Sequence, residues 1–270
     1  MTGRNILEAG DYQAPWVRDF YDAARVWWGD NAGDDGIEEQ RAAIVERLCR
    51  PGRKRVLELG AGSGATARRM AELGHDVVAI DLSSWIRSAG AAGPVAGGGS
   101  LRLVEGDYLV EKIDGRFDLV ADWDGFGIGT DDENHALLAR IGREWLAPGG
   151  AALVDVASPF YAYGTHGKRE ILDPLDDVPG SVEMDHRCSF DPVACRWVDR
   201  WIPTADPSAE RVQSVRSYTP ADFRLLLRGT GLRLDYAECD GVPLAAGHAV
   251  TIGGPLMTAY SYLVRLVQES

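Results

Sequence analysis

The residues best suited to chemistry lie close together along the chain, from Glu58 to Asp81. Gly60, Gly62 and Gly64 follow Glu58 at alternate positions, and Asp81 ends the segment. Glycine lets the backbone turn sharply and lets a ligand lie directly against the peptide groups. A carboxylate at the end of the following strand can accept hydrogen bonds from ribose hydroxyls. The spacing therefore predicts a turn that binds an adenosine-containing ligand.

The flanking residues predict the elements that position this turn. Residues 56–59 form a short apolar run, which indicates a buried strand. Residues 65–73 are good helix formers, and Gly74 is placed to end that helix. Residues 75–80 predict a second strand that carries Asp81 at its carboxyl end. The segment is thus a β-α-β unit, the layout that binds an adenosine ribose.

Two cofactors fit such a unit. Gly60, Gly62 and Ala65 match the G-x-G-x-x-A pattern of dinucleotide-binding folds, in which a pyrophosphate lies on the helix N-terminus. Glu58, Gly60, Gly62 and Gly64 form E-x-G-x-G-x-G, which resembles motif I of the class I S-adenosylmethionine methyltransferases. The carboxylate of Glu58 favours the second cofactor, because it would repel a pyrophosphate and attract the ammonium of a methionine moiety.

The resemblance to this family continues along the chain. A third strand-like run, residues 101–104, precedes Glu105-Gly106-Asp107-Tyr108, which is similar to the family's adenine-binding turn. A fourth strand, residues 117–121, ends in Asp122-Trp123-Asp124-Gly125-Phe126-Gly127. The motif Leu146-Ala147-Pro148-Gly149-Gly150 then precedes a fifth strand, residues 151–156. The order of these signals covers residues 55–156 and is more specific than one glycine turn.

The resemblance implies a fold, a cofactor and a set of residues. The fold is α/β, with a seven-stranded, mostly parallel Rossmann-like sheet that an antiparallel hairpin closes. The cofactor is S-adenosylmethionine, with S-adenosylhomocysteine as the product. Asp81 would bind the ribose hydroxyls, and Asp107 and Tyr108 would lie beside the adenine. The full set of expected cofactor-binding residues is Glu58, Gly60, Ala61, Gly62, Gly64, Asp81, Leu82, Gly106, Asp107, Tyr108, Asp122 and Trp123.

We divide the chain into four regions: an N-terminal helical cap (1–50), the cofactor-binding core (51–156), a substrate-capping insert (157–218) and a C-terminal completion of the core (219–270). Aromatic residues at three- and four-residue steps from Trp16 predict an amphipathic helix, and a second helix follows from Ile37. In related small-molecule methyltransferases an N-terminal helical segment covers the active site with a tyrosine, which implies a catalytic or orienting role for Tyr21.

The insert predicts antiparallel strands at residues 187–190, 195–202 and 210–216, lying over the carboxyl edge of the sheet. Its tryptophans either line a pocket or pack a small core of the insert itself. Thr219 predicts the N-cap of a later helix, and strands are expected at 232–238 and 255–264. The glycine-rich tract 89–100 predicts a loose surface loop. The expected substrate-binding residues are Trp28, Asp124, Phe126, Tyr161, Trp197 and Trp201.

A general base is harder to identify. Methyl transfer from a sulfonium is an in-line displacement that positioning alone accelerates strongly, although an amine acceptor must be neutral and a phenol must lose a proton. His166 and His186 lie in the insert, so they join Tyr21 as catalytic candidates. His75 is interpreted as structural, and His248 lies in a late loop with no visible partner. Because His166 and His186 stand apart from any cluster of carboxylates, the sequence predicts no metal site.

Composition narrows the class of protein. The chain has 270 residues and a formal net charge of −13, without a basic run, which argues against nucleic acid and anionic membranes as partners. Residues 1–13 are too polar for a signal peptide, and no run approaches the ~18 apolar residues of a membrane span. The four cysteines form no C-x-x-C pair, which predicts reduced thiols in a cytoplasmic enzyme.

The leading hypothesis is an S-adenosylmethionine-dependent methyltransferase that transfers a methyl group to nitrogen or oxygen of a small organic acceptor, a secondary metabolite. One alternative is a non-methylating enzyme, such as a cyclase, that retains the cofactor on the same fold. A nicotinamide-dependent oxidoreductase is a third. The acceptor, the general base and the oligomeric state, a homodimer included, stay open at this point.

Overall fold

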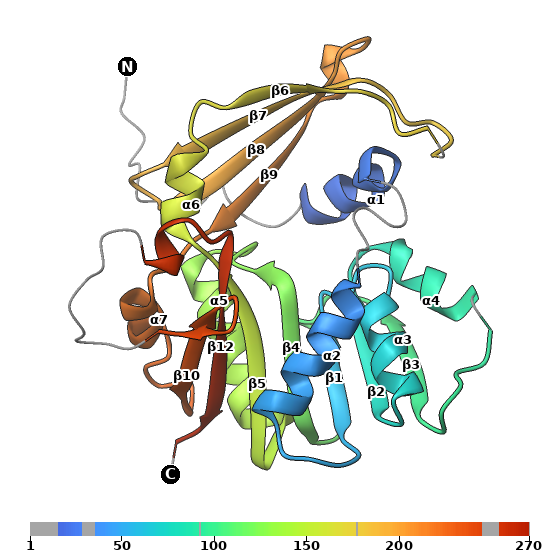
Figure 1. The fold of residues 1–270 in the computed structure, drawn as a ribbon, viewed down its shortest axis with the longest axis vertical. Helices are drawn as coiled ribbons and strands as arrows, with labels where there is room; N and C mark the ends of the chain where they lie inside the picture. The colour runs from blue at the N-terminus through green and yellow to red at the C-terminus, as the bar shows by residue number, and fades with distance from the viewer. Residues whose placement is uncertain (1–15, 29–35, 92, 177, 245–253, 270) are drawn as a thin grey trace.

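The computed structural model describes residues 16–28, 36–91, 93–176, 178–244 and 254–269. It contains an eight-stranded sheet with the order β11-β10-β12-β5-β4-β1-β2-β3 and a four-stranded sheet with the order β6-β7-β8-β9. Figure 1 shows the small sheet above one end of the large sheet, with helix α1 between them. The expected α/β fold with an antiparallel layer is therefore confirmed, although the large sheet has one strand more than expected.

Five parallel strands form the part of the large sheet that carries the predicted motifs: β1 (Arg55–Leu59), β2 (Asp76–Asp81), β3 (Ser100–Glu105), β4 (Phe117–Phe126) and β5 (Leu146–Ala157). The connecting helices are α3 (Ala65–Glu72), η2 (Ser84–Ile86), α4 (Arg87–Ala91), α5 (Asp131–Arg140) and the π-helical turn η3 (Ile141–Trp145). β4 and β5 are both longer than their apolar runs predict, because their pairing continues into the flanking motifs.

The C-terminal region completes the large sheet. It comprises α7 (Pro220–Leu226), β10 (Leu232–Cys239), the short β11 (Val242–Pro243), the 3-10 turn η5 (Pro255–Met257) and β12 (Ser261–Gln268). β12 is antiparallel to both β5 and β10, as expected of a closing hairpin. The strand expected at 255–264 begins later, because Pro255 opens a 3-10 turn instead. The predicted cap of α7 is confirmed, since Thr219 and Asp222 form a capping box.

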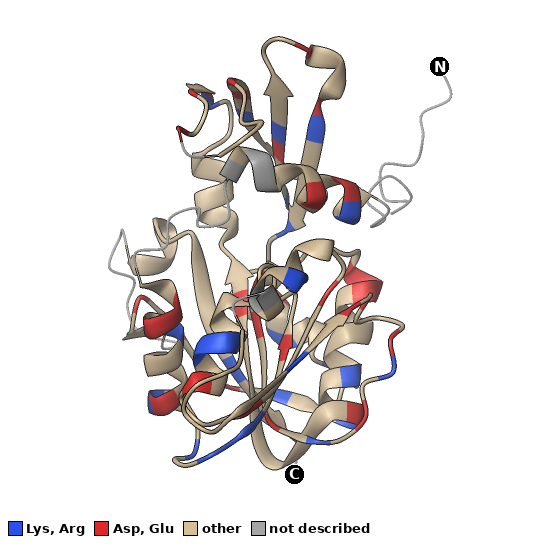
Figure 2. Ribbon diagram, turned by 90° about the vertical axis from the view of Figure 1, so that its right-hand side faces the viewer, with Lys and Arg blue, Asp and Glu red and all other residues tan. Residues whose placement is uncertain are grey.

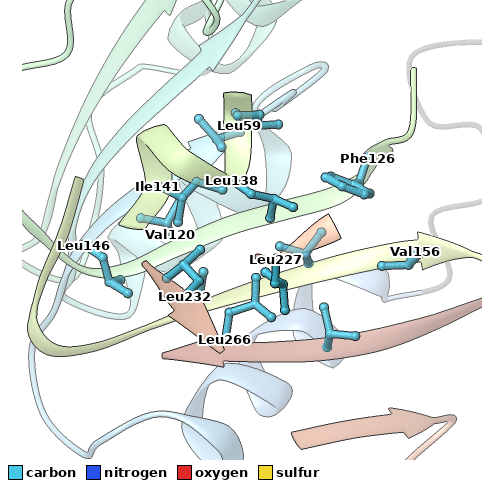
Figure 3. Packing of buried hydrophobic residues seen from close by; sticks show 14 of the residues in the cluster. Leu59, Val120, Phe126, Leu138, Ile141, Leu146, Val156, Leu227, Leu232 and Leu266 are labelled. Atoms are coloured by element: carbon cyan, nitrogen blue, oxygen red, sulfur yellow. The ribbon is translucent and has the colours of Figure 1, made fainter. Parts of the chain in front are cut away.

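Helices cover both faces of the large sheet with apolar side chains. On one face, α5, η3 and α7 bury a cluster around Leu138, Ile141 and Leu227, which Figure 3 shows against the strands. On the other face, α2 (Ile37–Leu48) and α3 bury a second cluster that includes Val45 and Met70. Burial of one such side chain contributes roughly 1.5–3 kcal/mol. The strand ends, and with them the predicted motifs, are thereby held in fixed positions.

The glycine-rich tract packs more closely than the sequence predicts. At Gly97 an added Cβ would lie 1.8 Å from the carbonyl oxygen of Glu72, and at Gly99 it would lie 2.1 Å from that of Ala71. Both carbonyls belong to α3, so the tract passes directly over this helix. The tract lies at the surface as expected, but the expectation of a loose loop is wrong at Gly97 and Gly99, because the missing side chains permit this close contact between backbones.

The four-stranded sheet consists of β6 (Arg169–Leu172), β7 (Met184–Asp191), β8 (Arg196–Pro203) and β9 (Arg211–Arg216), preceded by α6 (Pro159–Gly164) and with the 3-10 turn η4 (Pro207–Ala209) between β8 and β9. Helix α1 (Trp16–Trp28) packs Phe20 and Ala24 against Met184 and Trp201 of this sheet. Trp27 also stacks on Trp201, with 6.0 Å between the ring centroids. The N-terminal helix and the insert therefore share one small apolar core.

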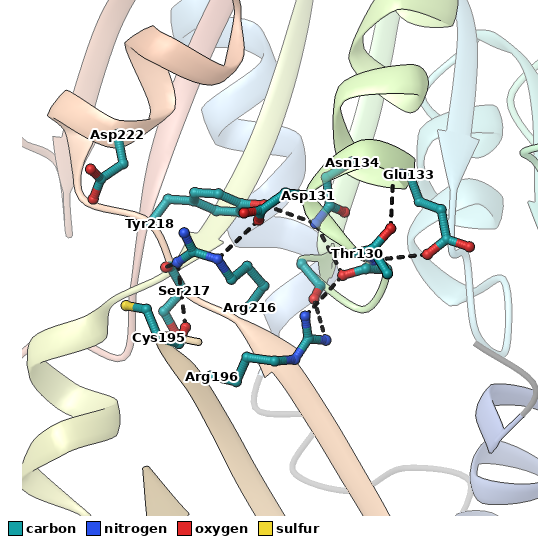
Figure 4. Close-up of polar contacts among 12 residues, drawn as sticks. Thr130, Asp131, Glu133, Asn134, Cys195, Arg196, Arg216, Ser217, Tyr218 and Asp222 are labelled. Carbon is teal, nitrogen blue, oxygen red and sulfur yellow. Dashed lines mark hydrogen bonds and ion pairs between the residues drawn. The ribbon is translucent and has the colours of Figure 1, made fainter. Parts of the chain in front are cut away.

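A buried arginine joins the small sheet to the large one. The guanidinium of Arg196, a residue only 3% exposed, donates hydrogen bonds to the carbonyl oxygens of Gly127, Ile128 and Gly129, and also to Ser214. Figure 4 shows this contact beside a second one, in which Arg216 donates to Asp131 at 2.9 Å. Because Gly127 to Gly129 follow β4, these bonds fix the insert over the carboxyl end of that strand.

We predict that Arg196→Ala lowers the free energy of unfolding by about 2–4 kcal/mol, because it removes several buried hydrogen bonds from one charged donor at once. Arg200 on the same strand pairs with Glu210 at the surface, so Arg200→Ala is the matched control. That exposed pair is worth less than about 1 kcal/mol. Urea unfolding of both variants measures the difference, and equal effects would contradict the role given to Arg196.

Candidate functional site

A cavity opens at the carboxyl ends of β1, β2 and β4, where parallel α/β sheets bind ligands. We call it the first cavity. Seven of the residues predicted to bind the cofactor line it: Gly60, Gly62, Asp81, Leu82, Asp107, Tyr108 and Trp123. Ala61, Gly64 and Gly106 belong to the turns around it. Residues far apart in the sequence therefore meet where the motifs predict.

Asp81 connects the two turns that flank the first cavity. Its carboxylate accepts hydrogen bonds from the N–H of Gly62 and from the N–H of Ser83, each at 2.7 Å. Gly60 and Gly62 have φ values of 59° and 55°, which residues with a side chain rarely adopt. Burial raises the pKa of Asp81, whereas the two N–H donors lower it. The carboxylate thus holds the glycine turn and also faces the cavity.

In the predicted adenine-binding turn, as in the glycine turn, an aspartate carboxylate accepts a backbone N–H group. The carboxylate of Asp107 accepts the N–H of Leu109 at 2.8 Å, and the N–H of Gly106 donates to the carbonyl of Asp81 at 2.8 Å. An added Cβ at Gly106 would lie 2.5 Å from the side chain of Glu111. Tyr108 and Asp107 are therefore presented at the cavity wall beside Asp81.

Two buried carboxyl groups lie behind this wall. Burial raises the pKa of Glu58 to about 8, and burial together with neighbouring Asp155 and Asp124 raises that of Asp122 to about 8. Neither carboxyl oxygen of Asp122 makes a hydrogen bond of ordinary geometry within the described part of the chain. Glu58 and Asp122 do not line the first cavity. A cation close to such a buried carboxyl group would favour its ionised form and lower its pKa.

A second cavity lies beneath the small sheet. Tyr21 and Asp124 line both cavities, so the two meet at these side chains. Asp124 is an exposed residue within β4 with a φ of 59°, and its carboxylate forms an ion pair of 2.5 Å with Arg41. The hydroxyl of Tyr21 accepts a hydrogen bond from the side-chain amide of Gln213 at 2.8 Å. The junction is thus built from α1, β4 and β9.

Aromatic side chains form much of the second cavity. Trp197, Tyr161 and Tyr260 contact one another, and each pair of ring centroids is separated by 5.3–5.6 Å. Trp201 stacks on His186 with 4.1 Å between the rings. All five of these residues line the cavity. Trp201 also belongs to the apolar core with α1, so the two alternatives for the insert's tryptophans both hold.

The catalytic and substrate predictions need two corrections. His166 is exposed, accepts the N–H of Phe190 at 3.0 Å and lines neither cavity, so it lies on the outer turn of the insert. Phe126 is buried against Tyr218 and Phe223 rather than exposed to substrate, because β4 continues and turns it into the core. The side chain of Trp28 and all of His248 lie outside the described residues.

Three functional candidates carry no signal in the sequence. Gln213 reaches Tyr21 only because β9 pairs with β8. Tyr260 precedes β12 and lines the second cavity. Asp155 lies on β5, where burial and Asp124 raise its pKa to about 7. The alternation of side chains along β5 predicts which face of the sheet Asp155 occupies. It does not predict that Asp124 of β4 lies close to it.

Comparisons with known proteins agree with this geometry. Residues 56–150 match a family model described as a methyltransferase domain. The ribosomal protein L11 methyltransferase of Thermus thermophilus is 35% identical over 119 residues, which is 43% of this chain and 44% of that protein. The cypemycin N-terminal methyltransferase of a Streptomyces species is 33% identical over 105 residues, 38% and 42% of the two chains. The chain thus spans less than half the length of these curated relatives.

Solved structures cover nearly the whole chain at low identity. The CcbJ methyltransferase from Streptomyces caelestis has a TM-score of 0.70 at 22% identity, over 94% of this chain and 96% of that one. SAM-bound CalS10, an amino pentose methyltransferase from Micromonospora echinaspora, has a TM-score of 0.60 at 20% identity, over 86% and 92%. The glycopeptide N-methyltransferase MtfA in complex with SAM has a TM-score of 0.56 at 23% identity, over 87% and 95%. This likeness shows the fold.

The raised pKa of Asp122 predicts a pH-dependent stability. The folded chain holds a proton up to about pH 8 that the unfolded chain releases near pH 4, so the free energy of unfolding falls as the pH rises through this window. Asp122→Asn removes the share of this pH dependence that Asp122 contributes, roughly 1.4 kcal/mol per pH unit between its two pKa values, whereas Glu58 and Asp155 keep theirs. Urea unfolding at pH 5 and pH 8 measures it, with the exposed Asp132→Asn as control. An unchanged pH dependence in Asp122→Asn would contradict the burial argument.

Proposed function

A methyltransferase domain spans residues 56–150 of a chain with the class I methyltransferase fold, and we propose that the chain is an S-adenosylmethionine-dependent methyltransferase of a small organic amine. The observation that carries the proposal is the junction of the two cavities at Tyr21 and Asp124. One cavity has the features of an adenosyl site, and the other has aromatic walls suited to an acceptor. Transfer needs a donor and an acceptor that meet at one point.

The residues of the first cavity fit S-adenosylmethionine. Asp81 offers a carboxylate to the ribose hydroxyls, and Asp107 with Tyr108 would flank the adenine. The glycine backbone at Gly60 and Gly62 allows close approach of the ligand. The cofactor supplies an electrophilic methyl group when bound. A pyrophosphate fits poorly, since the carboxylates of Asp81 and Asp107 line the same cavity and would repel it.

The methionine ammonium explains the two buried acids best. Glu58 and Asp122 lie behind the wall of the first cavity, and both hold their protons near neutral pH because they are buried. A positive charge within a few ångströms favours the ionised carboxylate and lowers such a pKa. The raised pKa values of Glu58 and Asp122 in the free protein are therefore consistent with a site that binds a cation.

An amine acceptor fits the second cavity. Aromatic rings and the carboxylates of Asp124, Glu170 and Asp199 line it, with Asp124 already paired with Arg41, and rings and carboxylates both attract an ammonium group. Lys168 and Arg169 also line it, but Arg169 is paired with Asp185. The relatives include one N-terminal methyltransferase and one glycopeptide N-methyltransferase, which supports nitrogen as the acceptor atom. A natural product is the proposed acceptor class.

Figure 2 shows acidic and basic residues interspersed along the ribbon rather than grouped by sign. This distribution supports a small acceptor over nucleic acid. Within the described ranges, no helix is long and apolar enough to span a membrane. All four cysteines are free thiols, which is consistent with the predicted cytoplasmic location.

Tyr21 is proposed as an orienting residue rather than a base. Burial, followed by the nearby carboxylates of Asp81 and Asp124, raises its pKa well above the ordinary value, so the phenol stays neutral at physiological pH. A neutral phenol at the junction can hydrogen-bond to the acceptor and fix its approach. The acceptor amine then needs only to arrive unprotonated, and positioning supplies most of the acceleration. The similarity to methyltransferases does not favour the non-methylating alternative.

Cofactor binding tests the first cavity. We predict that Asp81→Asn weakens S-adenosylhomocysteine binding by about 10- to 100-fold in titration calorimetry, since a hydrogen bond to a charged group is worth about 1.5–3 kcal/mol. Asp76→Asn on the same strand is the control, because Asp76 pairs with Arg53 at the opposite end of β2. Wild-type binding by Asp81→Asn, or tight binding of NADH by the wild-type chain, would refute the assignment.

Activity tests the junction. With a panel of small amines, phenols and amino sugars, mass spectrometry is expected to find one added methyl group on an amine. We predict that Tyr21→Phe lowers kcat by about 10-fold and changes KM little, because one orienting hydrogen bond is worth roughly 1–1.5 kcal/mol. Tyr163→Phe is the control, since Tyr163 is exposed on α6. Equal kcat values for the two variants would remove Tyr21 from the proposed mechanism.

A further inference from the structure

One wall of the second cavity gathers three side chains that can bind metals. On the antiparallel pair of β7 and β8, Cys188 lies opposite Asp199, and His186 lies opposite Trp201. Side chains two residues apart on a strand share a face, so His186 and Cys188 lie on the same face as Asp199. All three line the second cavity. This arrangement brings together an imidazole, a thiol and a carboxylate.

Their ligand atoms have the spacing of a coordination sphere. Nε2 of His186 lies 3.4 Å from Oδ1 of Asp199 and 3.7 Å from Sγ of Cys188, and all three atoms lie within 4.8 Å of one another. In a tetrahedral site with metal–nitrogen and metal–oxygen distances near 2.1 Å and a metal–sulfur distance near 2.3 Å, ligand atoms are separated by about 3.3–3.7 Å. The geometry therefore needs little adjustment to hold an ion.

A catalytic relay does not explain the same geometry, although burial and a hydrogen bond to Asp199 raise the pKa of the Cys188 thiol. In a relay, an acid contacts one imidazole nitrogen and the nucleophile contacts the other. Here Nε2 of His186 faces both the carboxylate and the thiol. Asp199 is only 7% exposed, and its Oδ1 accepts no hydrogen bond of ordinary geometry from any residue the structure describes. The stacking of His186 on Trp201 fixes the ring in this orientation.

We propose that His186, Cys188 and Asp199 bind a zinc-type divalent cation whose fourth ligand position faces the second cavity. A nitrogen, a sulfur and an oxygen donor suit Zn²⁺, whereas Mg²⁺ and Ca²⁺ prefer oxygen ligands alone. Three protein ligands with one open position are the pattern of zinc sites that bind a further molecule. The thiol proton passes to solvent on binding, and thiolate and carboxylate together balance the charge of the ion.

The ion would anchor the methyl acceptor. This role rests on the proposed function. Gln213 lies opposite Asp199 on β9, and its amide donates to the hydroxyl of Tyr21 at 2.8 Å. Gln213 therefore lies between the proposed ion site at Asp199 and the junction of the two cavities at Tyr21. A neutral nitrogen or oxygen atom of the acceptor can take the open position while another of its atoms lies at Tyr21. The cation then selects acceptors with two suitably spaced polar groups.

Metal binding can be measured without cofactor or acceptor. Equilibrium dialysis of the wild-type chain against Zn²⁺, followed by metal analysis, is expected to find one ion per chain. His186→Ala, Cys188→Ser and Asp199→Asn are each expected to weaken binding at least ~100-fold, because loss of even an outer partner of a ligand costs 10- to 100-fold. His166→Ala and Cys49→Ser are the controls, since neither residue lines the second cavity.

A second measurement avoids the risk that a variant fails to fold. In the wild-type chain, Zn²⁺ is expected to protect Cys188 from alkylation and to leave Cys195 reactive, as read by mass spectrometry. The absence of stoichiometric binding, wild-type affinity in the three ligand variants, or unprotected Cys188 would overturn the proposal. Calorimetry with S-adenosylhomocysteine on the same samples separates the two proposals, because the cofactor binds in the first cavity whether or not the ion is present.

Discussion

The structure at the carboxyl end of the large sheet depends on two hydrogen bonds that the carboxylate of Asp81 accepts from the backbone. By accepting the N–H groups of Gly62 and Ser83, this carboxylate joins the turn after β1 to the turn after β2. Both turns would otherwise leave backbone donors unpaired in a partly buried place, at a cost of about 1–3 kcal/mol each. The bare glycine backbone, the acid itself and the neighbouring Asp107 consequently face one cavity.

The second constraint is the attachment of the small sheet. Arg196 satisfies three consecutive carbonyl groups after β4, so the insert cannot shift without breaking several buried hydrogen bonds. Helix α1 closes the remaining side through Phe20 and Trp27. Tyr21 on that helix and Gln213 on β9 then meet over the carboxyl end of β4. The second cavity therefore depends on the packing of α1 and the small sheet, whereas the first cavity is formed largely by the turns at the ends of the parallel strands.

This difference explains what could be predicted from the sequence. The glycine turn and Asp81 follow from residues close together in the chain, and the periodicities of strand and helix locate them. Phe126 could not be placed, because the apolar run of β4 ends at Ala121 while the strand continues and its register shifts near Asp122. The grouping of His186, Cys188 and Asp199 depends on the register of β7 against β8, which no short motif specifies.

The central claim is that the proposed adenosyl site and the proposed acceptor site meet at Tyr21 and Asp124. A crystal structure with S-adenosylhomocysteine tests this claim most directly. We expect the ribose hydroxyls at Asp81, the adenine beside Asp107 and Tyr108, and the sulfur atom directed at Tyr21 and Asp124. An empty first cavity under saturating ligand, a ligand bound elsewhere, or a sulfur atom directed away from the second cavity would contradict it.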